Sequence, residues 1–320
     1  MKVLITGATG LVGKAITKAL HQRDIPVHYL TTRKEKIVSK ENYQGFFWNP
    51  SKGEIDTACF DGVTAIVNLA GATIAKKWTT SYKSKVLSSR LDSLSTLSFG
   101  LDQVDASQIE HFTSASAIGI YPSSQIDLCD EKDVGVDDSF LGKVVQKWEE
   151  KIKEFKKYSF NTVIMRIGIV LSNEGGALPK MAKPIKNFAG AAMGSGEQWQ
   201  SWIHIDDLAE MFVFAMTNNL KGVFNAVAPN PVTNSKMTKE LAKVLKRPLV
   251  LPHVPKPVMQ LLLGEMSYLL FASQRVCSKR IEKQGFIYTY SNIGSALEHL
   301  LKSKHPRQEG SMVSLDKEYV

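Results

Sequence analysis

Three glycines stand at the first turn of the chain, directly after a short apolar run. Gly7, Gly10 and Gly13 follow residues 2–6 and open an amphipathic helical segment. Between a strand and a helix, the first glycine permits the sharp turn, the second lets the backbone approach a pyrophosphate, and the third lets the helix pack on the sheet. The helix N-terminus adds N–H groups and a positive dipole. We therefore predict a dinucleotide site, with a glycine turn that binds nothing as the alternative. Its predicted residues are Gly7, Ala8, Thr9, Gly10, Leu11, Val12 and Gly13.

The second apolar run, residues 25–31, ends in hydroxyls and a cation where a carboxylate could stand. Thr31 and Thr32 are followed by Arg33. An acid at this position accepts from the ribose 2′-hydroxyl of NAD, whereas the 2′-phosphate of NADP requires a cation. A guanidinium can hold phosphate through two parallel hydrogen bonds. We predict that NADP(H) is preferred over NAD(H) through Arg33. A solvated Arg33 close to Glu35 is the alternative.

The elements that must position these residues alternate along the first half of the chain. Strands alternating with helices predict a parallel sheet covered on both faces. We expect an α/β fold, a doubly wound parallel Rossmann sheet of about seven strands with a small, mainly helical C-terminal lobe. The expected strands are residues 2–6, 25–31, 44–48, 63–70, 110–114, 161–171 and 202–205, and the expected helices are 11–22, 84–104, 138–157, 206–217, 235–245, 257–271 and 292–301.

The pattern of the sequence changes after residue 171, where glycine-rich and proline-rich loops interrupt the helical segments. We expect residues 1–170 to form the dinucleotide-binding domain, completed by about 197–228. Residues 171–196 and 229–302 are expected to form a substrate lobe. The segment 303–320 is polar and has no period, which predicts a disordered tail.

The composition is that of an ordinary globular protein, with 320 residues, 43% hydrophobic residues and a net charge of +9. The basic residues are scattered and no nucleic-acid-binding motif is present, so we expect a small-molecule substrate, with an anionic one as an option. The longest apolar stretch, 257–272, is interrupted by polar residues and predicts no membrane partner. No export signal is recognised at the start. The three cysteines lie far apart, which indicates a cytoplasmic protein without a cysteine-built metal site; no metal is expected. The sequence does not indicate an oligomeric state.

Several motifs together carry a family resemblance. The runs TGATGLVG (6–13), NLAGA (68–72), SASAIGIY (114–121) and WIHIDD (202–207) resemble those of the extended short-chain dehydrogenase/reductases, NAD(P)-dependent epimerases and dehydratases of nucleotide sugars. The chain is most similar to an atypical branch often labelled epimerase family proteins. That branch is marked by Trp78-Thr79, Ser89-Arg90, Trp148-Glu149, GSGxQW at 194–199 and PxPVTN at 229–234. The resemblance covers about residues 1–300.

The resemblance implies further site residues at the ends of the fourth and fifth strands. Leu69, Ala70 and Gly71 would line the cofactor, and Ser114 would lie beside it. Ser116 matches the serine or threonine that hydrogen-bonds substrate in the family. The loop residue Tyr121 could offer a second hydroxyl or could simply precede the turn at Pro122. The other candidates are Lys83 and Arg90 for an anionic substrate, His204 as a base, and Trp199 and Trp202 as a pocket roof, each with a purely structural alternative.

The sequence departs from the family at its catalytic pair. Typical members carry Tyr-x-x-x-Lys, in which the lysine lowers the pKa of the tyrosine that exchanges a proton with substrate. No tyrosine here is followed by lysine four places on, and the motif alignment puts Leu141 and Val145 at the two positions.

Two functions follow. One is an NADP-dependent oxidoreductase or epimerase-like enzyme that acts on a small polar substrate, with Ser116 and Tyr121 as its candidate catalytic residues. The alternative is a non-catalytic NADP(H)-binding regulatory or sensor protein, which the missing pair favours. Substrate-dependent loss of NADPH absorbance would separate the two.

Overall fold

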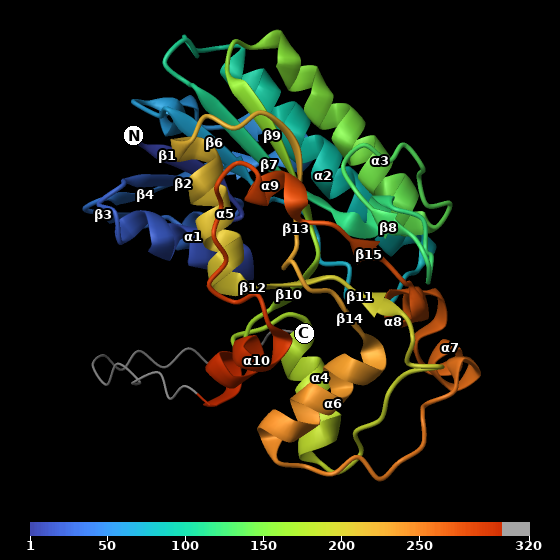
Figure 1. Cartoon of the computed structure of the whole chain (residues 1–320). Coiled ribbons are helices and arrows are strands. Elements are labelled where there is room, and N and C mark those ends of the chain that lie inside the picture. The colour runs from blue at the N-terminus through green and yellow to red at the C-terminus, as the bar shows by residue number, and fades with distance from the viewer. Residues whose placement is uncertain (303–320) are drawn as a thin grey trace.

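The computed structural model describes residues 1–302, and the predicted disordered tail 303–320 lies outside the described residues (Figure 1). Its main sheet has the strand order β13-β9-β7-β6-β1-β2-β4-β3. All neighbours from β13 to β4 are paired in parallel, and only β3 and β5 join β4 antiparallel. The expected doubly wound parallel sheet is therefore confirmed, with nine strands within residues 1–302 in place of about seven. Its strands are β1 (Val3–Thr6), β2 (Val27–Thr31), β3 (Ser39–Lys40), β4 (Tyr43–Asn49), β5 (Glu54–Ile55), β6 (Ala65–Asn68), β7 (His111–Ala117), β9 (Asn161–Ile167) and β13 (Gly222–Ala226).

Helices cover both faces of this sheet. Helix α1 (Leu11–His21) connects β1 to β2, and α2 (Thr80–Leu101) connects β6 to β7. In the strand order, these two connections run in opposite directions across the sheet. Because such crossovers are right-handed, they place α1 and α2 on opposite faces. Helix α5 (Ile205–Thr217) packs beside α1, and α3 (Phe140–Lys153) packs beside α2 (Figure 1).

Local sequence explains where the helices begin. The side chains of Thr79, Ser139 and Thr233 cap α2, α3 and α6 (Asn234–Leu245) by accepting a backbone N–H from the first turn. Helix α1 differs, since Gly10 stands at its N-cap position and no side chain from residues 1–302 caps it.

The C-terminal lobe has its own apolar core. Helices α4 (Ala177–Lys186), α6 (Asn234–Leu245) and α10 (Ile293–Lys302) pack together, and Leu11 and Val12 of α1 lie against their cluster. Because α1 begins directly after β1, the lobe sits at the carboxyl edge of the sheet (Figure 1). The boundaries expected between the two parts stay a prediction.

Two expected elements are broken in the structure, and one helix was not expected. The expected strand 161–171 is broken at Gly168, where a Cβ would lie 2.4 Å from the Ser201 carbonyl oxygen. The expected helix 257–271 is divided at Gly264, whose φ is +58°. Helix α4 has no expected counterpart, because glycines precede it and Pro184 lies inside it.

The remaining elements are short. They are β8 (Leu128–Cys129), β10 (Ile169–Leu171), β11 (Trp199–Gln200), β12 (Trp202–His204), β14 (Val232–Thr233), β15 (Arg275–Val276), α7 (Lys256–Leu263), α8 (Tyr268–Phe271), α9 (Lys279–Glu282), η1 (Lys34–Lys36), η2 (Pro50–Lys52), η3 (Thr57–Phe60), η4 (Ile118–Ile120), η5 (Glu154–Lys157) and η6 (Gly264–Ser267). None of the helices within residues 1–302 combines the length and apolar character that a membrane span needs.

Candidate functional site

The turn after β1 has a shape that fits a pyrophosphate. Gly7 has a φ of +74°, and its carbonyl oxygen accepts the Gly10 N–H at 3.0 Å. A Cβ on Gly13 would lie 2.2 Å from that same oxygen, so only glycine lets α1 begin this close to the turn. Since no side chain of the described residues caps α1, the N–H groups of its first turn stay available to an anion. Of the predicted residues, Thr9 and Gly10 are exposed, Gly7, Leu11 and Val12 are half-buried, and Ala8 and Gly13 are buried.

The loop after β6 lies directly against this turn. The Thr6 hydroxyl accepts the N–H groups of Leu69 and Ala70 at 3.0 and 3.1 Å and donates to Asn68 at 2.8 Å. The Asn68 side-chain amide in turn donates to the Ser114 hydroxyl at 3.0 Å. These contacts tie the ends of β1, β6 and β7 together. Ser114 is fully buried beneath that edge, and Leu69, Ala70 and Gly71 lie above it.

Arg33 lies at the end of β2, the strand next to β1. Its backbone N–H donates to the Thr31 hydroxyl at 3.2 Å, which fixes the start of the loop. The side chain is exposed, and no carboxylate within residues 1–302 forms an ion pair with it. The neighbouring Lys34 instead lies over the ring of Phe47, 5.0 Å from its centroid.

A cavity of about 190 Å³ opens at the ends of β7 and β9. Its floor includes Ala117 and Ile167, the last residues of those strands. A wider cavity of about 520 Å³ shares Tyr268 and Ala272 with it and leads outward beneath α7 and α8. The small cavity is lined by Ile74, Arg90, Ala117, Ile118, Gly119, Leu141, Val144, Val145, Trp148, Ile167, Gly168, Ile169, Trp199, Gln200, Ser201, Tyr268, Leu269, Ala272 and Gln274.

The wall contributed by α3 has no group that exchanges protons. Leu141 and Val145, the positions at which the family resemblance expects tyrosine and lysine, both line the cavity. The Tyr268 hydroxyl donates to Asp137 at 2.7 Å, and burial together with this carboxylate raises its pKa. Among the described lining residues, Arg90 carries the only full charge.

Ser116 points away from solvent and has a charged partner. It is 2% exposed, and its hydroxyl donates to Glu149 Oε1 at 2.7 Å. Glu149 also accepts two hydrogen bonds from Arg166, at 2.8 and 2.9 Å. Burial opposes the charge on Arg166, but the hydrogen bonds with Glu149 hold its pKa above the ordinary value.

Tyr121 completes the same buried network. Its hydroxyl accepts from Arg166 at 2.9 Å and donates to Asn225 at 2.7 Å. Burial raises the pKa of Tyr121 to about 12, so the phenol stays protonated at neutral pH. The catalytic roles of Ser116 and Tyr121 stay predictions, and both hydroxyls already have protein partners.

Sequence reasoning missed the centre of this network. In the sequence, Glu149 stands out only as part of the Trp148-Glu149 motif, and Arg166 and Asn225 belong to no motif. The available signal was Arg166 itself, a charged residue inside the apolar run of β9, because a buried charge needs a partner.

The other candidates fall on different parts of the lobe boundary. His204 is the N-cap of α5, since its Nδ1 accepts the Asp206 N–H at 3.0 Å. Lys83 forms an ion pair with Glu265. Trp199 lines the small cavity, whereas Trp202 is fully buried in the lobe core.

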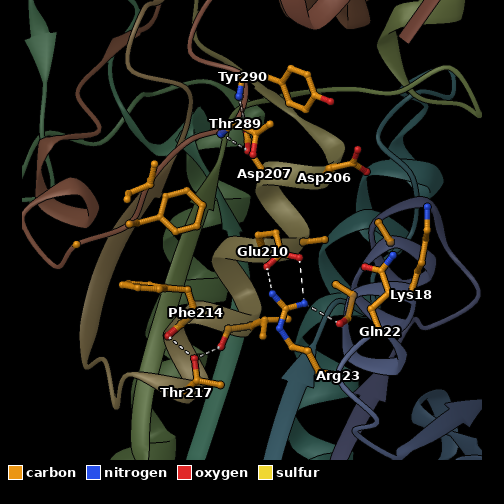
Figure 2. Close-up of a pocket in the computed structure, with 17 residues that line it drawn as sticks. Lys18, Gln22, Arg23, Asp206, Asp207, Glu210, Phe214, Thr217, Thr289 and Tyr290 are labelled. Carbon is orange, nitrogen blue, oxygen red and sulfur yellow. Dashed lines mark hydrogen bonds and ion pairs between the residues drawn. The ribbon is translucent and has the colours of Figure 1, made fainter. Parts of the chain in front are cut away.

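A groove of about 600 Å³ also runs between α1 and α5 (Figure 2). Arg23 spans it and makes two hydrogen bonds to Glu210, at 3.1 and 2.6 Å. Arg23 is thereby paired with a carboxylate, whereas Lys18, which also lines the groove, is exposed and forms no ion pair within residues 1–302.

Residues 3–226 match the NAD-dependent epimerase/dehydratase family, and residues 254–300 match a domain of unknown function, DUF1731. An epimerase family protein of Staphylococcus haemolyticus is 38% identical over 311 residues, covering 93% of this chain and 98% of the relative. The crystal structure of human epimerase family protein SDR39U1 with NADPH is 28% identical, has a TM-score of 0.83 and covers 94% of this chain and 99% of that one.

A more distant structure shows the fold alone. The UDP-glucuronic acid 4-epimerase of Bacillus cereus, in complex with UDP-glucuronic acid and NAD, is 15% identical with a TM-score of 0.73, and covers 94% of this chain and 98% of that one. The family match over residues 3–226 spans the glycine turn and the parallel sheet. The relative from Staphylococcus haemolyticus covers 93% of this chain. The chain belongs to the NAD-dependent epimerase/dehydratase family, in its atypical branch of epimerase family proteins.

Proposed function

We propose that this protein is an NADP(H)-dependent oxidoreductase that acts on a small polar substrate without a tyrosine–lysine pair. The observation that carries the proposal is the start of α1. No side chain of the described residues caps this helix, and the N–H of Gly10 donates to the Gly7 carbonyl oxygen at 3.0 Å. This geometry suits the pyrophosphate of a dinucleotide. When bound, the nicotinamide supplies or accepts a hydride.

The preference for NADP(H) is supported by the end of β2. Arg33 is exposed there, follows two threonines and is unpaired with any acid in the described chain. A carboxylate at that point would repel a 2′-phosphate, whereas a guanidinium binds it. The similar human protein SDR39U1 has a crystal structure with NADPH.

The proposed reaction site is the cavity of about 190 Å³ at the ends of β7 and β9. We assign Ser116 and Tyr121 to its support: with Glu149 and Arg166 they hold the strand ends that form the floor. Neither Leu141 nor Val145 can move a proton. The α3 wall therefore supplies no proton for hydride transfer, which leaves water, the substrate and the hydroxyls elsewhere in the lining, such as that of Tyr268, as its sources.

We also propose a cytoplasmic location. Cys59, Cys129 and Cys277 are all free thiols, which suits a reducing compartment.

The second candidate is a protein that senses NADP(H) and performs no chemistry. The apolar Leu141 and Val145 in the cavity wall favour it, because they remove the family's acid–base pair. The two functions differ in one assay. Loss of NADPH absorbance on addition of an oxidised substrate supports the enzyme, whereas tight NADPH binding with no turnover across a panel of carbonyl compounds supports the sensor.

A further inference from the structure

The small cavity holds a cation with no acid to balance it. Arg90 lies on α2 and lines the wall next to Trp148, whose ring centroid is 4.9 Å from its guanidinium carbon. The ion pairs of the described chain do not include Arg90. Burial lowers its pKa to about 10, so the group is still charged at neutral pH. An unbalanced charge in an apolar cavity favours an anionic ligand.

The hydrogen bonds of Arg90 leave one edge of the guanidinium free. Nη1 donates to the backbone oxygens of Ala72 at 3.2 Å and Val86 at 2.8 Å. Nε and Nη2 make no hydrogen bond to the described residues. These two donors form the edge that binds a carboxylate through two parallel bonds.

Two further polar groups of the same cavity lack partners. The indole Nε1 of Trp148 and the side-chain oxygen of Gln200 are buried and make no hydrogen bond within residues 1–302. Both residues line the cavity, and they are 6% and 9% exposed. Buried polar groups are rarely left unsatisfied, which indicates that a polar ligand completes them.

From these groups we infer that the cavity binds a small organic acid that carries a hydroxyl group, with its carboxylate on the free edge of Arg90 and its hydroxyl donating to the Gln200 side-chain oxygen. The inference rests on the proposed function, because it takes this cavity as the substrate site. The cavity has room for roughly six water volumes, which limits the buried part of the ligand to a small molecule.

The other source of an anion is the cofactor. Arg90 packs close to Gly71, whose Cβ would lie 3.2 Å from the guanidinium carbon, and Gly71 belongs to the loop beside the glycine turn. A phosphate of NADPH would present the same chemistry. The cavity walls favour the substrate, because Arg90 shares them with residues at the ends of β7 and β9 and with α3.

The test compares three probes on the full chain: 2-hydroxybutyrate, its neutral amide and butyrate. Binding is followed by NMR through the Trp148 indole N–H. We expect 2-hydroxybutyrate to bind at least about tenfold more tightly than its amide, because one charge-assisted pair is worth that much. Arg90→Met should abolish this difference, and Arg90→Lys should retain part of it. We also expect 2-hydroxybutyrate to bind more tightly than butyrate, by a smaller factor, because only the hydroxy acid can donate to Gln200. Gln200→Leu should abolish this second preference.

Lys85→Met is the matched control, because Lys85 is an exposed cation on the same helix and is absent from the cavity wall. It should leave all three affinities unchanged. Equal binding of the acid and its amide to the wild-type protein overturns the inference. So does an Arg90→Met variant that loses NADPH affinity in calorimetry while it still prefers the acid. Wild-type protein that prefers the acid but binds no NADPH instead contradicts the proposed cofactor and leaves the acid site standing.

Discussion

The hydroxyl of Ser116 donates a 2.7 Å hydrogen bond to Glu149, and both side chains are almost fully buried. A hydroxyl has one proton, so in this arrangement Ser116 can only accept a hydrogen bond from any other group. Glu149 is held in turn by Arg166, and Arg166 by Tyr121. The network therefore stabilises the ends of β7 and β9, from which the cavity floor is built.

Tyr121→Phe should cost more stability than Ser116→Ala. Loss of the phenol leaves the buried Asn225 Oδ1 without its donor and Arg166 Nη1 without its acceptor, at about 2 kcal/mol or more in the free energy of unfolding. Ser116→Ala removes one of three hydrogen bonds to Glu149 and should cost about 1 kcal/mol. Urea denaturation measures both. The exposed Ser51→Ala is the control, and a Tyr121→Phe variant as stable as wild type would show that the network contributes nothing.

Gly10→Val should weaken NADPH binding by at least about tenfold, or 1.4 kcal/mol. The branched side chain would occupy the place where a pyrophosphate approaches the backbone. Gly294→Val in the first turn of α10 is the matched control, because a Cβ there also meets its nearest atom at 3.2 Å. Calorimetry on the folded proteins compares the two. Undiminished affinity in Gly10→Val would remove the turn as the phosphate site.

Arg33→Ala should weaken NADPH binding and leave NADH binding nearly unchanged. One charge-assisted contact to phosphate is worth about 1.5–3 kcal/mol, or about ten- to a hundredfold in affinity. The neighbouring Lys34, which lies over Phe47, serves as control through Lys34→Ala. Equal losses for both cofactors in Arg33→Ala would contradict a role in reading the 2′-phosphate.

Stability should fall as the pH is lowered from 7 to 5, in part through His204. Burial lowers its pKa to about 4, an effect that the neighbouring Asp206 carboxylate only partly offsets, against about 6.5 in the unfolded chain. Because the folded state binds the proton less readily than the unfolded chain, the contribution of His204 to stability is fully present above pH 6.5 and is lost as the pH falls toward 4. The effect is on the order of 2 kcal/mol between pH 7 and 5.

The variant His204→Asn isolates this contribution. Asparagine keeps an acceptor for the Asp206 N–H, so the cap of α5 is preserved while the titrating group is removed. Its unfolding free energy should depend less on pH than that of the wild type. Identical pH profiles for the two proteins would mean that His204 does not titrate on unfolding.

The parallel sheet could be predicted from sequence because its signals are local. The apolar run before Gly7 and the helical pattern after Gly13 identify a strand, a turn and a helix without knowledge of the rest of the chain. The break at Gly168 could not be predicted. It arises from the close approach of Ser201, more than thirty residues later, which no local pattern records.

The chemistry of the site was harder to predict for the same reason. Ser116 and Tyr121 were identified as single hydroxyls, but their partners Glu149, Arg166 and Asn225 come from three other elements. Arg90 was recognised as a candidate for binding anions. Only the folded chain places it beside Trp148 and Gln200, in one cavity.

The most direct test of the account is a crystal structure of the protein with NADPH. The account predicts the pyrophosphate against the first-turn N–H groups of α1, the 2′-phosphate beside Arg33 and the nicotinamide toward the cavity at the ends of β7 and β9. NADPH bound elsewhere, for example in the groove between α1 and α5, or with its 2′-phosphate away from Arg33, would contradict it.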